Sequence, residues 1–440
     1  MAKKYLISDF LKRIKRPVEL KNNEEYKLVT VKMNHNGVVL RERRKGSEIK
    51  SNMFLVKEGD FILSGIDARN GAFGIIPDEL NNAIVTNDFW YFEIDENIIS
   101  KELFLELTAT NWFDDICKKG SDGTTQRIRL QKGKFFNQTV QLPEKFEQKE
   151  ILSKISLFKQ DLKIFKQENE IQKNRLSKLC QSILQEAIQG KLTAEWREQN
   201  PCIEPATELI KRIKAEKEQS IKEKKIKREK PVSPISKDEI PFELPQGWMW
   251  CRLGEIAQHN SGKTLHKGQN KGKLRDYITT SNLYWNKFEL DNIKQIKIEE
   301  KELERFTAIK GDLLICEGGD VGRAAIWDKD YDICFQNHIH RVRVYSSISV
   351  KYLYYNMMYL YGNRVILSYK KGMGIPNLSG MALSSIVIPL PSFLEQQAIV
   401  SKLETLLEKC NKLQEEIEKM NKNSKELLRA LFNETFKCYN

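Results

Sequence analysis

The chain has 440 residues, of which 40% are hydrophobic and 30% charged, a balance that permits buried cores and excludes wholesale disorder. The formal net charge of +13 favours a polyanionic partner, either nucleic acid or an anionic membrane. No apolar run approaches the roughly 20 residues that span a bilayer, and the start of the chain has no apolar signal core, so we expect a cytoplasmic protein. Its eight cysteines stand singly, which favours free thiols and predicts no metal site.

The first segment, 1–142, mixes strand-like and helical runs and is long enough for a core of its own. Ala83–Thr86 is typical of a buried strand and Lys101–Trp112 of a helix. Its polar loops supply candidate DNA contacts, since Arg, Asn and Gln can bind base edges and Thr can bind phosphates. For any single residue, an ordinary exposed loop position is the simpler interpretation. The candidates are Arg41, Arg43, Arg69, Asn70, Asn87, Thr124, Thr125, Gln126 and Arg127.

The second segment, 143–189, has the pattern of one long helix. Apolar residues recur there at alternating spacings of four and three, which is the mark of a coiled-coil seam. Asn169 and Gln172 are polar positions within this seam. Its apolar members are Ile151, Ile155, Phe158, Leu162, Phe165, Leu176, Leu179 and Ile183.

A linker, 190–245, follows the first long helix. Its stretch 206–230 is rich in Lys, Arg and Glu and predicts a solvated basic helix. Prolines from Pro231 to Pro241 end this helix and indicate a domain boundary before Trp248.

The next segment, 246–390, again mixes strand-like and helical runs. Leu313–Cys316 predicts a strand and Ser349–Tyr361 a helix. Glu317–Gly322 contains three glycines after the predicted strand, but it lacks the spacing of a dinucleotide loop and is more typical of a tight turn. The candidate DNA contacts of this segment are Ser261, Lys263, Thr264, Asn337, Lys370, Lys371 and Asn377.

The last segment, 391–436, predicts a second long helix that repeats the first. Leu142–Lys154 and Leu390–Lys402 share seven of 13 positions at a constant offset of 248 residues, and Gly59-Asp60 resembles Gly311-Asp312. The duplication predicts two α/β (α+β) modules related by a pseudo-two-fold axis, with the two seams paired; two helices packed separately on their own modules are the alternative. Cys410 and Ser424 also lie in the second seam. Its other members are Ile399, Leu403, Leu406, Leu413, Ile417, Met420, Leu427 and Leu431.

The sequence lacks the catalytic motifs that would be expected of an enzyme acting on DNA. Ser261-Gly262-Lys263-Thr264 supplies only the end of a phosphate loop, because Ala257 stands where the first glycine is required. Asn200-Pro201-Cys202 stops short of the loop of DNA amino-methyltransferases, and His338 and His340 lack further metal ligands at suitable spacing. We therefore predict a chain with no catalytic residue and no cofactor of its own.

These segments together resemble the specificity subunit of type I restriction–modification systems over essentially the whole chain. The resemblance rests on the duplicated Pro-x-x-Phe/Leu-Glu-Gln-x-x-Ile stretch that opens each long helix, on Ala187–Leu192 and on Lys211–Lys217. Leu244–Trp250 opens the second module in the manner of this family, and in the first module Val85–Asp88 and Thr124–Arg127 look like parts of its target recognition domains.

The resemblance implies two target recognition domains separated by an antiparallel pair of long helices. Each domain would recognise one half of a bipartite, asymmetric DNA site, and the helices would set the gap. Two modification subunits that bind S-adenosylmethionine, and restriction subunits that use ATP and Mg²⁺, would join this chain. A self-contained restriction–modification enzyme and a coiled-coil interaction protein without sequence-specific DNA binding are the alternatives.

Overall fold

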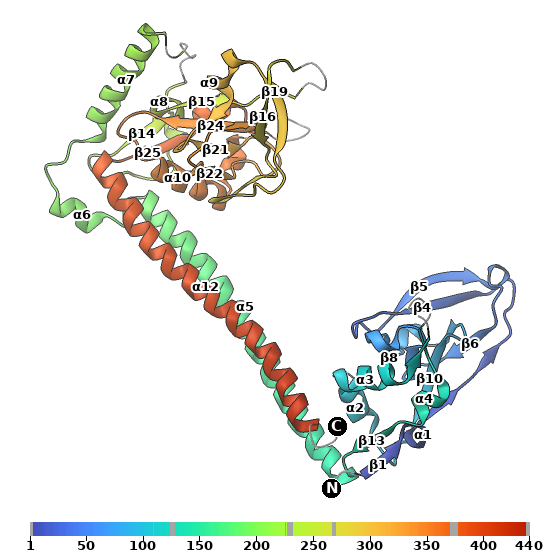
Figure 1. The fold of residues 1–440 in the computed structure, drawn as a ribbon. Coiled ribbons are helices and arrows are strands. Elements are labelled where there is room, and N and C mark those ends of the chain that lie inside the picture. Colours follow the sequence, from blue (N-terminus) through green and yellow to red (C-terminus); the bar gives the residue numbers. More distant parts are fainter. Residues whose placement is uncertain are drawn as a thin grey trace. The chain divides into compact units, whose positions relative to one another are not determined.

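The computed structural model describes residues 3–108, 110–123, 128–224, 226, 232–265, 270–369 and 377–436. The chain divides into two compact units. Unit one comprises Met1–Glu170 and Ile417–Asn440, and unit two comprises Ile171–Glu416. Each unit contains one globular module and a part of both long helices (Figure 1).

Module one is the globular part of unit one. Its strands and helices alternate in short elements, as the mixed sequence pattern predicts, although the expected helix over Lys101–Trp112 is two helices, α2 and α3. In chain order its elements are β1 (Lys3–Leu6), α1 (Ile7–Phe10), β2 (Leu11–Ile14), β3 (Pro17–Val18), β4 (Glu25–Val31), β5 (Val38–Lys45), η1 (Gly46–Glu48), β6 (Met53–Val56), β7 (Phe61–Ser64), η2 (Ala68–Asn70), β8 (Phe73–Ile75), η3 (Asp78–Leu80), β9 (Ala83–Val85), β10 (Phe89–Ile94), α2 (Lys101–Thr108), α3 (Asn111–Lys119), β11 (Ser121–Asp122), β12 (Arg129–Leu130), α4 (Lys132–Phe136) and β13 (Thr139–Leu142).

Module two is the globular part of unit two. The predicted strand at Leu313–Cys316 is present as β21, and the predicted helix over Ser349–Tyr361 is α10. Its elements are β14 (Met249–Arg252), α8 (Leu253–Ile256), β15 (Ala257–Ser261), β16 (Lys273–Ile278), β17 (Leu283–Tyr284), β18 (Lys287–Phe288), β19 (Lys294–Ile298), η5 (Glu300–Glu302), α9 (Leu303–Phe306), β20 (Thr307–Ala308), β21 (Leu313–Cys316), β22 (Ala324–Ile326), β23 (Ile333–Phe335), β24 (Ile339–Val344), α10 (Val350–Gly362), η6 (Val365–Tyr369), α11 (Gly380–Ser385) and β25 (Val387–Leu390).

The two modules have the same sheet topology, which confirms the duplication inferred from sequence. An antiparallel sheet has the order β2-β10-β7-β8 in module one and β15-β24-β21-β22 in module two. A second sheet contains the order β6-β9-β4-β5 in one and β20-β23-β16-β19 in the other, each with one parallel pair, β4 with β9 and β16 with β23. A two-stranded sheet joins the first and last strands of each module, β1 with β13 and β14 with β25.

A buried aspartate holds the same turn in each module. Asp60 accepts two hydrogen bonds from Arg16 and one from the backbone N–H of Lys57, and its side chain is 10% exposed. Asp312 accepts two from Arg343 and one from the N–H of Ile309. Each aspartate follows a glycine with positive φ, Gly59 at 77° and Gly311 at 94°, a conformation that glycine adopts without strain. The faint sequence echo of Gly-Asp thus has a structural cause, because both turns lead into the central strands β7 and β21.

The two long helices, α5 (Lys145–Ile188) and α12 (Phe393–Phe436), run antiparallel in each unit (Figure 1). In unit one, Asn169 donates a hydrogen bond from Nδ2 to Oδ1 of Asn421 at 2.8 Å. In unit two, the Cys180 thiol contacts the Cys410 thiol, and burial together with this neighbour raises the pKa of Cys180 to about 11. The helices therefore pair with each other, as the seams predict.

The predicted seam positions form two alternating series along each helix. One series contains Leu176, Ile417 and the polar residues Asn169 and Ser424, which are buried, and the other series contains several exposed residues. On a straight helix, the positions of a strict seven-residue repeat rotate around the helix axis by about 20° per heptad. A helix that packs on a single neighbour buries only a narrow stripe of its surface. On α5 the buried stripe accordingly passes through Cys180 instead of the adjacent Leu179. The residues that are exposed against expectation are Leu179, Leu413, Met420 and Leu427, and the side chain of Leu431 lies outside the described residues.

A glutamine of the duplicated motif joins each long helix to its module. Gln148 accepts a hydrogen bond from the N–H of Ser100 and donates to the carbonyl of Pro143. Gln396 does the same with Ser349 and Pro391. Both glutamines are almost fully buried, and a buried amide has to be hydrogen-bonded to be tolerated. The identity of this glutamine in both repeats follows from that role.

The linker differs from the solvated basic helix that its composition predicts. It forms α6 (Ala194–Gln199) and α7 (Ala206–Lys222). Leu209, Ile210 and Ile213 on α7 are buried in the core of unit two, because three apolar residues at helical spacing outweigh the surrounding charges when a surface is available. Several charged residues of α7 are exposed, whereas Glu216 and Lys217 contact module two at the N–H of Ser346 and the carbonyl of Gly254.

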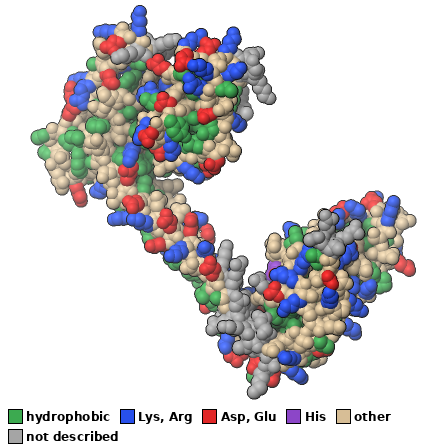
Figure 2. Space-filling model, viewed as in Figure 1, with side chains coloured by type: hydrophobic (Ala, Val, Ile, Leu, Met, Phe, Trp, Pro, Cys, Tyr) green, Lys and Arg blue, Asp and Glu red, His purple; other side chains and the backbone are tan. Residues whose placement is uncertain are grey.

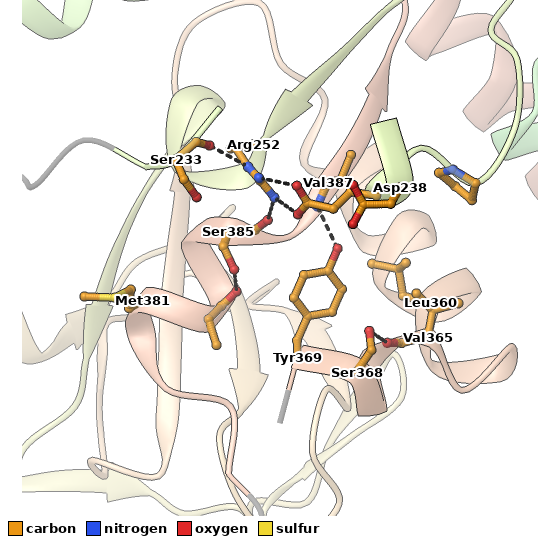
Figure 3. Close-up of a pocket in the computed structure, with 13 residues that line it drawn as sticks. Ser233, Asp238, Arg252, Leu360, Val365, Ser368, Tyr369, Met381, Ser385 and Val387 are labelled. Atoms are coloured by element: carbon orange, nitrogen blue, oxygen red, sulfur yellow. Dashed lines mark hydrogen bonds and ion pairs between the residues drawn. The ribbon is translucent and has the colours of Figure 1, made fainter. Parts of the chain in front are cut away.

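Arg252 at the end of β14 anchors the later part of the linker on module two (Figure 3). Its guanidinium donates to both carboxylate oxygens of Glu239 and to the carbonyls of Ser233, Pro234 and Ser385. This ion pair lowers the pKa of Glu239 to about 2. A groove of about 600 Å³ lies beside it and is lined by linker and module residues that include Tyr369 and Met381.

Candidate nucleic-acid interface

Three segments meet at one end of the four-stranded sheet in module one. They are the loop that follows β7, the turn that precedes β10, and the strand β12. The N–H of Gly65 donates to the carbonyl of Asp88 at 2.8 Å, and the N–H of Leu130 in β12 donates to the carbonyl of Gly65 at 2.8 Å. These two bonds hold the three segments together, and we call the group the loop cluster of module one.

Module two has the same loop cluster, held by the equivalent bonds. The N–H of Glu317 donates to the carbonyl of His338 at 2.9 Å, and the N–H of Leu378 donates to the carbonyl of Glu317 at 2.9 Å. The glycine-rich stretch Glu317–Gly322 is the turn between β21 and β22 in this cluster. The backbone frame is therefore repeated, while the side chains that it presents differ between the modules.

Several predicted DNA contacts of module one lie in its loop cluster. Arg69 and Asn70 lie in η2, directly after β7, and Asn87 lies in the turn before β10. Thr124, Thr125, Gln126 and Arg127 lie outside the described residues, and the described Gly123 and Arg129 flank them.

Arg41 and Arg43 lie elsewhere, on the edge strand β5. Arg41 faces Glu42 at 3.4 Å and Arg43 faces Glu25 at 3.6 Å. Charged side chains on an edge strand also protect it from pairing with other chains. Because they lie on β5, these two arginines are not brought together with the other candidates. Figure 2 shows Lys and Arg side chains spread over module one, with Asp and Glu side chains among them.

The structure brings Ser261, Lys263 and Asn337 of module two together. The Ser261 hydroxyl donates to the carbonyl of Asn337 at 2.9 Å, and the N–H of Asn337 donates to the carbonyl of Lys263 at 3.0 Å. Gly262 lies so close to the chain at Phe335 that a Cβ would come within 2.3 Å of its carbonyl oxygen. The stretch that resembles the end of a phosphate loop is therefore a strand extension packed on the turn before β24.

The remaining candidates of module two lie at the margins of this cluster. The Lys263 ammonium pairs with Glu302 at 2.5 Å, and this contact lowers the pKa of Glu302. Thr264 and Asn377 are exposed. Lys370 and Lys371 lie outside the described residues.

Sequence reasoning missed Arg13 on β2, which adjoins the loop cluster of module one. Its guanidinium carbon lies 4.4 Å from the centre of the Trp90 ring, and Nη2 donates to the Asn87 carbonyl at 3.2 Å. Burial lowers the pKa of Arg13. Arg129 is also in the cluster, where it pairs with Asp88 at 2.9 Å. The stacking on Trp90 crosses from β2 to β10, so no local sequence signal marks it.

A second missed group lies on the β21–β22 turn of module two. The Arg323 guanidinium lies 4.9 Å from the Tyr284 ring centre and donates to the Thr280 carbonyl at 2.7 Å. The Tyr361 hydroxyl donates to Asp320 at 2.6 Å, and this hydrogen bond raises the pKa of Tyr361. Aromatic rings beside arginine suit stacking and phosphate contacts.

In the part of the chain that the structure describes, no group of three or more His, Cys, Asp or Glu side chains is placed to hold a metal ion. Among the same residues, no helix combines the length and the apolar character that crossing a membrane requires.

Two curated relatives from Escherichia coli resemble this chain over more than half of its length. The specificity subunit of type I restriction enzyme EcoAI is 32% identical over 244 residues, which are 53% of this chain and 40% of the relative. The specificity subunit of type I restriction enzyme EcoEI is 31% identical over 271 residues, which are 58% of this chain and 44% of the relative. The aligned parts thus span less than half of each relative.

Two solved structures share the fold. A chain from a structure of complex assembly and conformational transition in the type I R-M system matches with a TM-score of 0.63 at 14% identity, over 99% of this chain and 97% of that chain. The HsdS subunit from Thermoanaerobacter tengcongensis matches with a TM-score of 0.54 at 15% identity, over 99% and 96% of the two chains. At these identities the two matches establish a common fold.

The family described as the type I restriction modification DNA specificity domain matches the chain twice, at residues 6–173 and 245–420. The two matches cover well over half of the chain, and each contains one loop cluster and the beginning of one long helix. The chain therefore belongs to the type I restriction modification DNA specificity domain family.

Proposed function

We propose that this chain is the DNA sequence-specificity subunit of a type I restriction–modification complex and that each module recognises one half of a bipartite site. The observation that carries the proposal is the repeated loop cluster, which has the same backbone bonds but different side chains in the two modules. Trp90 and Arg13 in module one correspond by strand register to His340 and His259 in module two. A common frame with different side chains suits an asymmetric site, because base edges are distinguished by the side chains that meet them.

The antiparallel helices suit the role of a spacer between the half sites. Each helix has 44 residues, which corresponds to about 66 Å at 1.5 Å per residue. Readers that approach one face of DNA through the major groove are spaced by about 34–36 Å or multiples of it. We assign module boundaries at 1–142 and 246–390, spacer helices at 143–189 and 391–436, and a linker at 190–245.

The exposed apolar residues of the long helices suit two modification subunits. On α5, Leu157, Ile164 and Ile171 recur every seven residues and are exposed, and on α12 Leu413, Met420 and Leu427 do the same. Apolar rows of this kind on a helix favour docking of further helices. The two rows do not coincide at the offset of 248 residues, but the exposed Phe146 and Leu179 of α5 do correspond to the exposed Leu394 and Leu427 of α12. These repeated exposed positions suit two copies of one partner.

The docking proposal predicts that a double substitution, Leu413→Glu and Leu427→Glu, releases modification subunits. Both leucines are already about half exposed, at 48% and 57%, so the isolated chain is expected to keep its stability within about 0.5 kcal/mol. Co-purification from cells that express both subunits measures the effect. Glu416→Lys, at an exposed polar position of α12, is the control. Undiminished co-purification of the double variant would contradict the proposal.

The complex as a whole would then divide its tasks among subunits. The modification subunits would bind S-adenosylmethionine and transfer methyl groups to adenine, and restriction subunits would use ATP and Mg²⁺. This chain would hold no cofactor and would select the site in the cytoplasm.

Binding selectivity tests the proposed function directly. We expect the complex with modification subunits to prefer its own site over unrelated duplex DNA by about 10³-fold or more at physiological salt. The measurement is competition between labelled site DNA and unlabelled unrelated DNA. Binding that is equal for all sequences and falls steeply with salt would indicate phosphate contacts alone, and would support an interaction protein instead. Methyl transfer by the purified chain without a partner would support the self-contained enzyme.

A further inference from the structure

A buried carboxylate in unit two joins three separate segments of the chain. Glu395 lies in the first turn of α12, and its side chain is 5% exposed. Its Oε1 accepts hydrogen bonds from the Thr193 hydroxyl at 2.8 Å and from Arg197 at 2.5 Å. Its Oε2 accepts from the indole N–H of Trp248 at 2.8 Å. We call these four residues the Glu395 cluster.

The three segments are those that connect module two to the helix pair. Thr193 and Arg197 follow the end of α5, and Trp248 directly precedes β14, the first strand of module two. The Arg197 guanidinium also lies 5.8 Å from the centre of the Trp248 ring. The cluster therefore binds the end of one long helix, the start of the other and the entry to module two to a single carboxylate.

The packing around the cluster leaves little freedom for these segments. Gly190, where the chain turns at the end of α5, has φ of 72°, and a Cβ there would come within 2.7 Å of Pro245 and 2.9 Å of Trp248. Thr193 is 1% exposed and Trp248 is 8% exposed. Removal of one member would leave buried donors or acceptors without partners, which is more costly than the loss of the bond itself.

A small rotation at this point would matter for DNA recognition. A module of about 140 residues is roughly 30 Å across. A rotation of about 10° at its base would then move its far side by about 5 Å, which exceeds the rise of about 3.4 Å per base pair. The angle at which module two leaves the helix pair thus decides which base pairs its loop cluster meets.

We propose that Glu395 is a positioning residue that fixes the angle of module two on the helix pair and thereby sets the gap at which the second half site is accepted. This inference rests on the proposed function. It does not require Glu395 to touch DNA, and it concerns the spacing of the half sites and not their sequence.

The test uses the complex with modification subunits and duplexes that carry the split site determined for the wild-type complex. One duplex has the native gap, and two have gaps one base pair shorter and one base pair longer. We expect Glu395→Gln and Trp248→Phe to reduce the affinity ratio between native and altered gaps by about tenfold or more. Trp248→Phe keeps the ring and removes only the indole donor, so it keeps the test valid even if Glu395→Gln fails to fold.

Two controls make the outcome specific. Glu404→Gln removes another carboxylate of α12 that contacts module two, where it pairs with Lys351 at 2.7 Å. Because this ion pair is exposed, it contributes little to stability. We therefore expect the Glu404→Gln complex to keep the wild-type gap preference. Arg197→Lys keeps a donor and a charge and is expected to retain part of the preference. A wild-type preference that survives in Trp248→Phe, with module two folded, would overturn the inference alone. Equal binding of the wild-type complex to unrelated DNA would overturn the proposed function and the inference with it.

Discussion

Replacement of Asp312 by alanine is expected to destabilise module two by about 3 kcal/mol and to leave module one unchanged. Asp312 is 2% exposed and accepts three hydrogen bonds. Breaking a buried ion pair by removing one partner costs about 3–5 kcal/mol. The Arg343 side chain is 34% exposed, so water can partly replace its partner, and the lower end of that range applies.

The duplication supplies a matched experiment, because Asp60→Ala should do the same to module one. Hydrogen exchange measured on peptides of each module is the appropriate method, since a chain with two units need not unfold in one transition. A loss of about 3 kcal/mol corresponds to roughly a 100-fold loss of protection against global opening. Asp330→Ala removes a carboxylate that is 86% exposed and pairs with Lys310, and it should leave the protection unchanged. Equal loss of protection in both modules after a single substitution would contradict the independence of the two folds.

Insertion of seven residues into each long helix is expected to lengthen the unread gap by about three base pairs. Seven helical residues add about 10 Å, and each base pair adds about 3.4 Å. The insertions belong directly after Asn169 in α5 and directly before Asn421 in α12, because these residues face each other. A whole heptad at facing positions keeps the buried stripe in register.

The gap is measured by selecting bound duplexes from a library in which the spacing between the half sites is random. Insertion into α5 alone is the control, since it displaces the two stripes relative to each other and should abolish specific binding. A double-insertion complex that binds the original spacing would show that the helices do not set the gap.

The sequence predicted the large-scale organisation because that organisation depends on patterns that repeat. Two copies of one motif and two seven-residue seams indicated two modules and two paired helices, and the common sheet topology confirms the duplication. The Gly-Asp echo was the faintest of these signals, yet it marks the most deeply buried aspartates of the two modules. Local patterns of this kind are set by local backbone geometry, so they survive in the sequence.

Features that depend on contacts between distant segments were predicted less well. The exposure of Leu413 and Met420 follows from the narrow interface of two helices, which heptad spacing alone does not report. Burial of Ile210 in the linker follows from the presence of module two beside α7. The stacking of Arg13 on Trp90 depends on strand pairing, and nothing in the local sequence indicates it.

The candidate DNA contacts show the same division. Asn87 and Asn337 lie at equivalent places in the two loop clusters. Arg41 is predicted as part of a polar loop, but it lies on the edge strand β5 beside Glu42. Individual contacts with bases remain predictions, because residue type identifies side chains that can bind DNA but not the surface that meets it.

A map of methylated adenines across a genome tests the central claim most directly. The chain is co-expressed with its modification partner, once in full and once with Asp312→Ala in module two. We predict that the full chain gives one split motif with two defined halves, and that the variant loses that motif while Asp330→Ala retains it. A continuous motif, or methylation at the same split motif after module two has lost its fold, would contradict recognition of one half site by each module.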